Sequence, residues 1–184
     1  MGKSAKTKPT LKSVKVLRVG HRYVRDYRTL THLCLVSRAL GVEAIYLEEV
    51  EKELEETVAE VNRTWGGDFA VLEGEWRRVI KDAKAEGRTI VHLTMYGVPL
   101  QDKVDELKEK GSFLIAVGGP KVPAEVYQLA DYNIAVTSQP HSEIAALAIA
   151  VHDLQGGEEL KKEFGNSRLS IVPSPKGKMI EQKP

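Results

Sequence analysis

Short apolar runs alternate with amphipathic segments along most of this chain. Runs with the length and composition of buried strands lie at residues 14–19, 43–47, 69–72, 89–94, 113–117 and 132–137. Segments with helical character separate or follow them, at residues 29–40, 48–65, 75–86, 99–110, 123–130 and from about 140 to 156. Because strands that alternate with helices form parallel sheets, the pattern predicts an α/β fold with a mostly parallel sheet and helices on both faces.

The loops that follow the strands are where such a fold places its ligands. In open parallel sheets, ligands bind beyond the carboxyl ends of the strands, in the loops that lead to the next helices. In this chain the loops of interest are residues 20–28, 94–99, 118–123 and 137–143. We therefore expect the functional site to be assembled from these four segments.

The length of the chain, 184 residues, fits one domain of ordinary size. We predict a single domain over residues 14–178, between a basic flexible tail at 1–13 and a short tail at 179–184, with 169–172 as a possible final strand. No apolar stretch approaches the roughly 20 residues of a membrane span, so no membrane association is expected. The single cysteine, Cys34, excludes an intrachain disulfide and fits a core residue of a cytoplasmic protein.

Positive charge is concentrated near the N-terminus. Residues 1–28 contain nine lysines and arginines and one acid, whereas residues 48–60 contain seven acids and one lysine. The net charge of +1 hides this asymmetry. The distribution predicts a positive end that attracts phosphates and an acidic face that repels them.

The loop after the first strand is rich in arginine. Arginine binds phosphate oxygens through two parallel hydrogen bonds, and the tyrosines between the arginines can stack on exposed bases. The alternative is a salt-bridged surface loop, although Asp26 is the one acid in the segment. We favour contact with RNA. The candidate RNA-binding residues are Arg18, His21, Arg22, Arg25 and Arg28.

The run Gly118-Gly119-Pro120-Lys121 directly follows the fifth strand. Two glycines remove side chains where a ligand has to lie against bare backbone, and proline then fixes the chain direction. A tight strand-to-helix turn without a ligand is the alternative. The run is neither a dinucleotide-binding fingerprint nor a phosphate-binding P-loop, because the required glycine and lysine spacings are missing.

The last long helix has an unusual composition. Ser138 is a candidate N-cap, and Pro140 suits a first turn. Residues 144–151 are apolar on every side, so the helix must be buried all round. In a chain of this size that suggests packing partly against a second subunit, with a central core helix as the alternative. His92 and His141 lack the spacing of metal ligands, so no metal site is expected.

Taken together, these loops resemble those of the archaeal tRNA (cytidine(56)-2′-O)-methyltransferases, a family of the SPOUT superfamily. The resemblance extends from about Val14 to Lys178. The segments that carry it are LRVGHR at 17–22, Arg25-Asp26, Arg28, Thr31-His32, SRALG at 37–41, HLTMYG at 92–97, 118–123, ADYN at 130–133, QPHSE at 139–143, LKKEF at 160–164, 171–173 and 177–178.

The resemblance implies a homodimer that binds tRNA and methylates the ribose 2′-hydroxyl of cytidine 56 in the T-loop. It also implies a deep trefoil knot in the C-terminal part, whose loops hold S-adenosyl-L-methionine. Carried over by position, the cofactor-binding residues are Leu93, Gly118, Gly119, Pro120, Lys121, Val122, Val136, Thr137, Ser138, Gln139, Pro140, His141, Ser142 and Glu143.

Two catalytic residues also follow from the resemblance. Arg38 and Ser142 stand where the wider superfamily of ribose methylases has an arginine at the reaction centre and a serine in its last motif. Arg38 is expected to position the 2′-hydroxyl and to assist the loss of its proton. The chain departs from that superfamily at His32 and Pro140, where many members have asparagine.

Three other functions are compatible with the sequence. The first is a methyltransferase of the same fold that acts on another RNA position. The second is a non-enzymatic RNA-binding α/β module, and the third is a doubly wound nucleotide-binding domain, although the phosphate-binding fingerprints of that class are absent.

Overall fold

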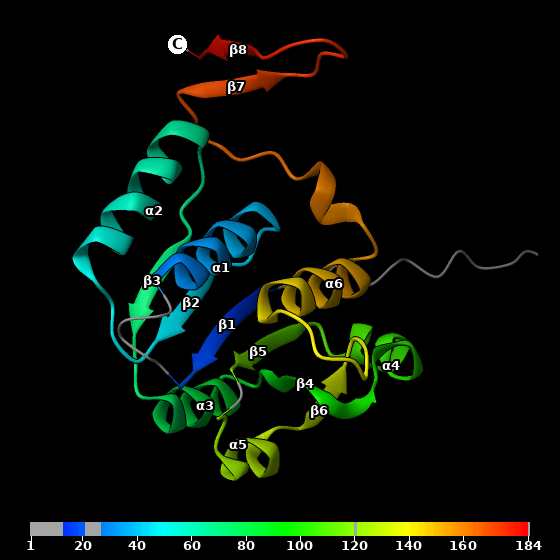
Figure 1. Cartoon of the computed structure of the whole chain (residues 1–184). Helices are drawn as coiled ribbons and strands as arrows, with labels where there is room; N and C mark the ends of the chain where they lie inside the picture. Colours follow the sequence, from blue (N-terminus) through cyan, green and yellow to red (C-terminus); the bar gives the residue numbers. More distant parts are fainter. Residues whose placement is uncertain (1–12, 21–26, 120, 184) are drawn as a thin grey trace, which may run out of the picture.

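A six-stranded parallel sheet forms the centre of the molecule (Figure 1). The computed structural model describes residues 13–20, 27–119 and 121–183. The strands lie in the order β3-β2-β1-β5-β4-β6, and each neighbouring pair runs parallel. Their bounds are β1 Ser13–Val19, β2 Ala44–Leu47, β3 Ala70–Glu73, β4 Thr89–Pro99, β5 Ser112–Gly118 and β6 Tyr132–Ala135. The predicted strands and their parallel arrangement are confirmed. The prediction of a loop at residues 94–99 was wrong, because β4 continues to Pro99 through an irregular stretch and pairs again with β6.

The predicted helices are present with shifts at their ends. The α-helices are α1 Tyr27–Ala39, α2 Lys52–Trp65, α3 Trp76–Ala85, α4 Val104–Lys108, α5 Ala124–Leu129 and α6 Glu143–Gln155, with 3-10 turns η1 Leu100–Asp102 and η2 Glu158–Lys161. The predicted helix over 99–110 was wrong in one respect. It is a 3-10 turn followed by the short α4, because Lys103 leaves helical geometry with φ −124° and ψ −10°.

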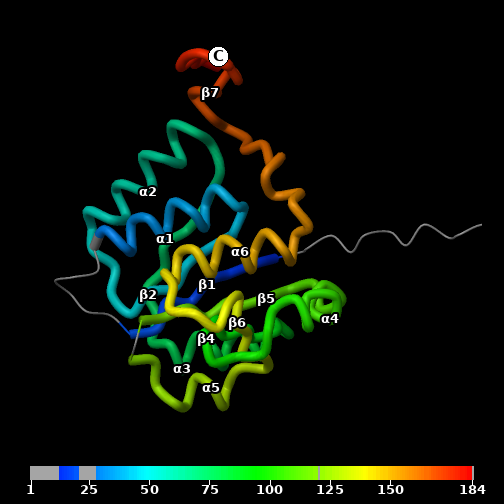
Figure 2. The backbone as a smooth tube through the Cα atoms, turned by 45° about the vertical axis from the view of Figure 1, so that its right-hand side comes forward, coloured from blue at the N-terminus to red at the C-terminus, as the bar shows by residue number. Residues whose placement is uncertain are grey.

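Helices cover both faces of the sheet, as Figures 1 and 2 show. One face packs against α1, α2 and α6, with Leu33, Leu54 and Leu147 among the buried residues. The opposite face packs against α3 and α5, with Ile80 and Val126 buried there. Because both faces are covered, the central strands read as nearly continuous apolar runs, which is why the sequence revealed them.

Strand β4 contains an irregularity that shapes the site. Its pairing with β6 shifts register between Leu93 and Val98, so the intervening residues leave the regular ladder. A Cβ atom on Gly97 would lie 2.5 Å from the backbone carbonyl of Asn133. Glycine at this position therefore lets β4 return to its neighbour after the bulge.

A separate hairpin follows the main sheet. Strands β7 (Leu169–Val172) and β8 (Met179–Gln182) pair antiparallel and project from the body beyond the end of α2 (Figure 1). Its connection to α2 includes a hydrogen bond from the Arg168 amide to the Thr64 carbonyl, at 3.1 Å. The strand at 169–172 was predicted, whereas β8 falls in the segment taken as a short tail.

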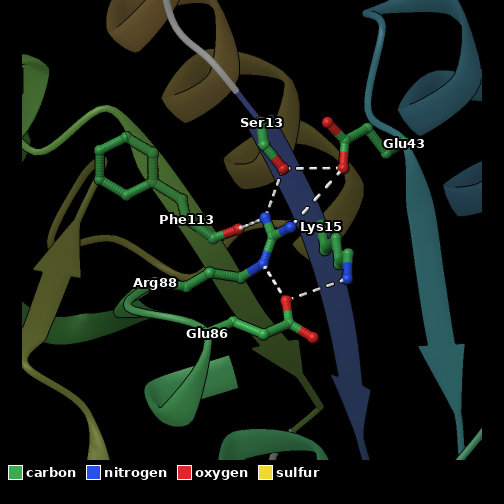
Figure 3. Close-up of polar contacts among 6 residues, drawn as sticks. All are labelled: Ser13, Lys15, Glu43, Glu86, Arg88 and Phe113. Carbon is green, nitrogen blue, oxygen red and sulfur yellow. Dashed lines mark hydrogen bonds and ion pairs between the residues drawn. The ribbon is translucent and has the colours of Figure 1, made fainter. Parts of the chain in front are cut away.

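A polar network ties together the amino ends of the strands (Figure 3). The Arg88 guanidinium donates to Glu86 at 2.7 Å and also contacts Ser13 and the Phe113 carbonyl. Ser13 donates in turn to Glu43 at 2.7 Å. These contacts connect β1, β5, the turn before β2 and the turn before β4, so the network stabilises the edge of the sheet opposite the ligand loops.

Candidate active site

A cavity of about 720 Å³ opens at the carboxyl ends of β1, β4 and β5. All four loops singled out from the sequence contribute to it. The described residues that line it are Arg18, Val19, Gly20, Thr29, His92, Leu93, Thr94, Met95, Tyr96, Val117, Gly118, Gly119, Lys121, Val122, Tyr127, Pro140, His141, Ser142, Glu143 and Ala146. The predicted location of the site is therefore occupied by a cavity large enough for a small molecule.

The two adjacent glycines at the end of β5 have different structural roles. A Cβ atom on Gly118 would lie 2.5 Å from the Val122 side chain and 2.9 Å from the Val19 carbonyl oxygen. Gly118 thus permits the chain to pack closely on itself. A Cβ atom on Gly119 would meet one neighbour within 4 Å, the Arg18 guanidinium at 4.0 Å, among the described residues. Gly119 is the glycine that leaves room for a ligand.

Helix α6 begins at the cavity. Its N-cap is Ser142, whose hydroxyl oxygen accepts a hydrogen bond from the Ile144 amide at 3.2 Å. The prediction of Ser138 as the cap was wrong, because the chain between β6 and Ser142 stays non-helical. Since the Ser142 oxygen accepts from the backbone, its hydroxyl proton is available for a ligand.

Arg18 and Glu143 form an ion pair in the cavity wall. The Arg18 Nε lies 3.4 Å from the Glu143 Oε1, and the two side chains are 6% and 11% exposed. The second carboxylate oxygen of Glu143, Oε2, is buried and has no hydrogen-bond partner within the part of the chain that the structure describes. Arg18 therefore lies inside the site, whereas it had been grouped with the surface residues that contact RNA.

A hydrogen-bonded group of side chains supports the irregular stretch of β4. The Asn133 amide donates to the Tyr127 carbonyl at 2.9 Å, so its oxygen faces the Nδ1 of His92, also at 2.9 Å. Burial lowers the pKa of His92 from its ordinary value, which favours the neutral ring. The Tyr127 hydroxyl lies 3.0 Å from the Thr94 hydroxyl. These contacts fix the orientation of the cavity wall beneath the bulge.

Arg38 lies away from this cavity. It is nine residues beyond the lining residue Thr29 on α1, which corresponds to about 14 Å along the helix. Its Nε donates to Asn62 at 3.0 Å, another guanidinium nitrogen donates to the Gly66 carbonyl, and the group stacks on the Phe164 ring at 4.8 Å. These contacts connect α1 with α2 and with the segment that follows η2.

The remaining candidates divide into three groups. Of the predicted cofactor-binding residues, Val136, Thr137, Ser138 and Gln139 do not line the cavity. Arg28 is exposed at the start of α1. Pro120, His21, Arg22 and Arg25 lie outside the described residues.

Several lining residues were not predicted as site residues. Met95 and Tyr96 lie in the irregular stretch of β4 between Leu93 and Val98, for which the sequence indicates a loop without roles for these two residues. Tyr127 comes from α5, where nothing in the local sequence distinguishes a wall residue from a core residue. The interpretation of Cys34 as a core residue is confirmed, since its side chain is fully buried. This burial raises the pKa of its thiol to about 12.

Comparison with solved structures defines the class of the fold. An RNA 2′-O ribose methyltransferase superposes with a TM-score of 0.62 at 15% identity, over 84% of this chain and 60% of that one. The SpoU methyltransferase AviRb of Streptomyces viridochromogenes, crystallised with AdoMet, gives 0.57 at 9% identity, over 86% and 63%. This chain therefore has the fold of the SpoU-type RNA methyltransferases, although it spans less than two thirds of the length of those two proteins.

Sequence comparison identifies the family. The family model described as "tRNA ribose 2'-O-methyltransferase, aTrm56" matches residues 65–181. The tRNA (cytidine(56)-2'-O)-methyltransferase of Nitrosopumilus maritimus is 46% identical over 92% of this chain and 97% of its own length. The protein of that name from Methanopyrus kandleri is 48% identical, over 91% and 95%. The chain belongs to the tRNA (cytidine(56)-2′-O)-methyltransferase family, and the resemblance noted in the sequence is confirmed.

Proposed function

We propose that this protein transfers a methyl group from S-adenosyl-L-methionine to the ribose 2′-hydroxyl of cytidine 56 in tRNA. The observation that carries the proposal is the meeting of two turns at one cavity, those at Gly118 and at Pro140 to Glu143, in a chain of this family. Both turns follow parallel strands at the edge where this type of sheet binds ligands.

The residues present suit the proposed cofactor. The cavity volume of about 720 Å³ lies in the range of small-molecule sites. Leu93 and Val122 offer apolar contacts, while Gly119 leaves backbone uncovered and Glu143 offers a carboxylate oxygen. When bound, the cofactor supplies a methyl group on a sulfonium, which is already activated for transfer.

The protein then has to align the ribose hydroxyl and assist the loss of its proton. Ser142 is the predicted catalytic residue that lines the cavity, and its hydroxyl can donate to an oxygen held there. A catalytic role for Arg38 requires a second subunit, because within one chain it is held by Asn62 and Gly66 at a distance from the cavity.

A homodimer is therefore part of the proposal. On α6, Ala145 and Ile149 lie one helical turn apart and are both exposed, with Ile149 at 45%. The sequence predicted a helix buried on every side, and a second copy of the chain would cover this apolar face. Sedimentation should give the mass of two chains for the native protein and of one chain for Ile149→Glu. A single-chain mass for the native protein would contradict the dimer.

We also propose the deep trefoil knot that the family resemblance implies. The segment after β5 places β6 beside β4, and α6 then returns to pack on β5 and β4, which is compatible with threading through an earlier loop (Figure 2). A crystal structure traced through residues 89–155 provides the test. A chain path that can be pulled straight from both ends would contradict it.

Binding of tRNA is assigned to the arginine-rich loop. Gly20 and Thr29, which flank the loop, both line the cavity, so a phosphate backbone bound there passes the site. Because cations displace counterions from phosphates, the affinity for tRNA should fall steeply as salt rises from 50 to 200 mM. An affinity independent of salt would remove the loop from the interface.

A tRNA substrate and a free buried thiol also favour a cytoplasmic location. Within the described residues, no helix is long and apolar enough to cross a membrane.

One assay tests the function as a whole. The full chain is incubated with an unmodified tRNA transcript and S-adenosyl-L-methionine carrying a labelled methyl group, and the labelled nucleotide is mapped. The proposal predicts label on the ribose of cytidine 56, and none when that ribose is a deoxyribose. Label at another position would favour the alternative of a related methyltransferase with a different target.

A further inference from the structure

The cavity wall contains a buried carboxylate whose hydrogen bonding is incomplete among the described residues. Among the described lining residues, Glu143 is the one carboxylate. Its Oε1 faces the Arg18 guanidinium at 3.4 Å, while its Oε2 is buried and has no partner among those residues. A buried carboxylate oxygen without a hydrogen bond is costly, because water that solvated it in the unfolded chain has been removed.

Two features place positive charge beside this carboxylate and fix its position. Arg18 comes from the carboxyl end of β1 and supplies the opposite charge. Glu143 is also the first residue of α6, a 13-residue helix, where the positive end of the helix dipole favours a negative side chain. Arg18 thus positions Glu143, and the oxygen that remains can accept from a ligand.

The proposed cofactor offers several groups to this oxygen. Its sulfonium carries charge but no N–H or O–H donor, and its ribose hydroxyls and adenine amine donate without charge. Its α-ammonium group combines a full positive charge with three donors. Charge-assisted hydrogen bonds are about twice as strong as neutral ones, so the ammonium group offsets the burial of the carboxylate best.

We propose that Glu143 binds the α-ammonium group of the methionine part of the cofactor, with Arg18 as the residue that holds Glu143 in position. This inference rests on the proposed use of S-adenosyl-L-methionine. It assigns the amino-acid end of the cofactor to the side of the cavity formed by β1 and α6, and the adenosine part to the remaining wall.

Two nucleosides can show whether Glu143 binds the α-ammonium group or contributes to cofactor binding in another way. S-adenosylhomocysteine has the α-ammonium group, whereas 5′-methylthioadenosine has the same adenosine and sulfur without the amino-acid part. Calorimetry on the full chain should show that Glu143→Gln weakens S-adenosylhomocysteine roughly ten- to a hundredfold, the effect of losing one charge-assisted hydrogen bond. The affinity for 5′-methylthioadenosine should stay unchanged.

A matched control is available on α5. Glu125 also lies in the first turn of its helix and pairs with an arginine, Arg77 at 2.7 Å, but it does not line the cavity. Glu125→Gln should leave both affinities as in the native protein. If Glu143→Gln weakens both nucleosides equally, Glu143 binds the adenosine part and the assignment is overturned. Unchanged affinity for both also overturns it.

A second measurement needs no variant. S-adenosylhomocysteine that lacks its α-amino group alone should bind the native protein with the same ten- to hundredfold loss. Full affinity for that analogue overturns the assignment even if Glu143→Gln fails to fold. If neither adenosine compound binds the native protein, the proposed cofactor itself is wrong, which distinguishes that failure from an error about Glu143.

Discussion

The two ends of the sheet both carry an arginine next to glutamates, but they use the pair differently. At the amino end, Arg88 contacts Glu86, Ser13 and the Phe113 carbonyl, and Glu86 also accepts from Lys15 at 3.2 Å (Figure 3). At the carboxyl end, Arg18 faces Glu143, one of whose buried oxygens lacks a partner among the described residues.

This difference separates a structural network from a binding site. The Glu86 side chain is 48% exposed, so water can reach its carboxylate. The Glu143 side chain is 11% exposed and lines the cavity, where we propose that a ligand completes its hydrogen bonding. A polar group that is buried and incompletely satisfied identifies the functional end of the sheet more clearly than the presence of charge does.

The largest effect on binding and stability is expected from adding a side chain at Gly118, where the chain packs closely on itself. Gly118→Val should place methyl groups against Val122 and the Val19 carbonyl, displace the loop, and reduce nucleoside binding below detection. The overpacking should also lower the free energy of unfolding by about 1–3 kcal/mol. Urea unfolding and calorimetry provide the two readouts.

Gly119→Ala is the matched control for stability, since its Cβ atom would meet one neighbour, at 4.0 Å. It should unfold as the native protein does. Equal destabilisation by both substitutions would contradict the division of work between the two glycines.

The next largest effects are expected from single substitutions in the two arginine–glutamate groups, one at each end of the sheet. Arg88→Met should lower the free energy of unfolding by about 1–3 kcal/mol, since several hydrogen bonds to charged groups are lost. It should leave the affinity for S-adenosylhomocysteine unchanged. Glu143→Gln should instead weaken the binding of S-adenosylhomocysteine and leave the free energy of unfolding unchanged. The comparison fails if Arg88→Met weakens the nucleoside as strongly as Glu143→Gln does.

Arg38 is a third arginine, and measurements of stability and activity can decide whether its role is structural or catalytic. Its contacts with Asn62, Gly66 and the Phe164 ring resemble the structural network, so Arg38→Ala should destabilise the fold by about 1–3 kcal/mol. Melting curves and methylation of tRNA are measured together. Unchanged melting with abolished methylation would instead assign Arg38 to catalysis in the proposed dimer.

The smallest expected effect is a loss of folding stability as the pH falls. Burial depresses the pKa of His92 below its ordinary 6.5, so the unfolded chain gains a proton first and stability should begin to fall as the pH drops below about 6.5. The hydrogen bonds from Arg88 and Lys15 depress the pKa of Glu86 below its ordinary 4.5, so its contribution is lost below about that pH.

Urea unfolding at pH 7, 5.5 and 4 checks this order, with His92→Gln as the control variant. The native protein should lose stability between pH 7 and 5.5, and His92→Gln should lose less in that interval. Identical losses would mean that His92 does not titrate as its burial requires.

Much of the fold was readable from the sequence for a physical reason. Strands buried on both faces, such as β1 and β5, have to be apolar throughout, and the loops at their carboxyl ends are fixed by the parallel arrangement. Strand β8 was missed because Met179 and Ile180 are exposed and show no alternation of buried and exposed positions.

The site was predictable at the level of loops but not of side-chain contacts. Arg18 and Glu143 are 125 positions apart, and no local pattern indicates that they meet. Arg18 was grouped with the exposed Arg28 because both belong to one arginine-rich segment, although Arg18 still lies in β1 and turns inward. Ser138 and Ser142 are equally good caps by composition, and the length of the turn after β6 decided between them.

A crystal structure of the full chain with S-adenosylhomocysteine tests the central claim most directly. We predict a nucleoside between the Gly118 turn and the Pro140 to Glu143 turn, with the α-ammonium nitrogen within about 3 Å of the Glu143 carboxylate. A nucleoside bound elsewhere on the protein would contradict the assignment of the cavity, and one bound there with its amino group directed away from Glu143 would contradict the orientation.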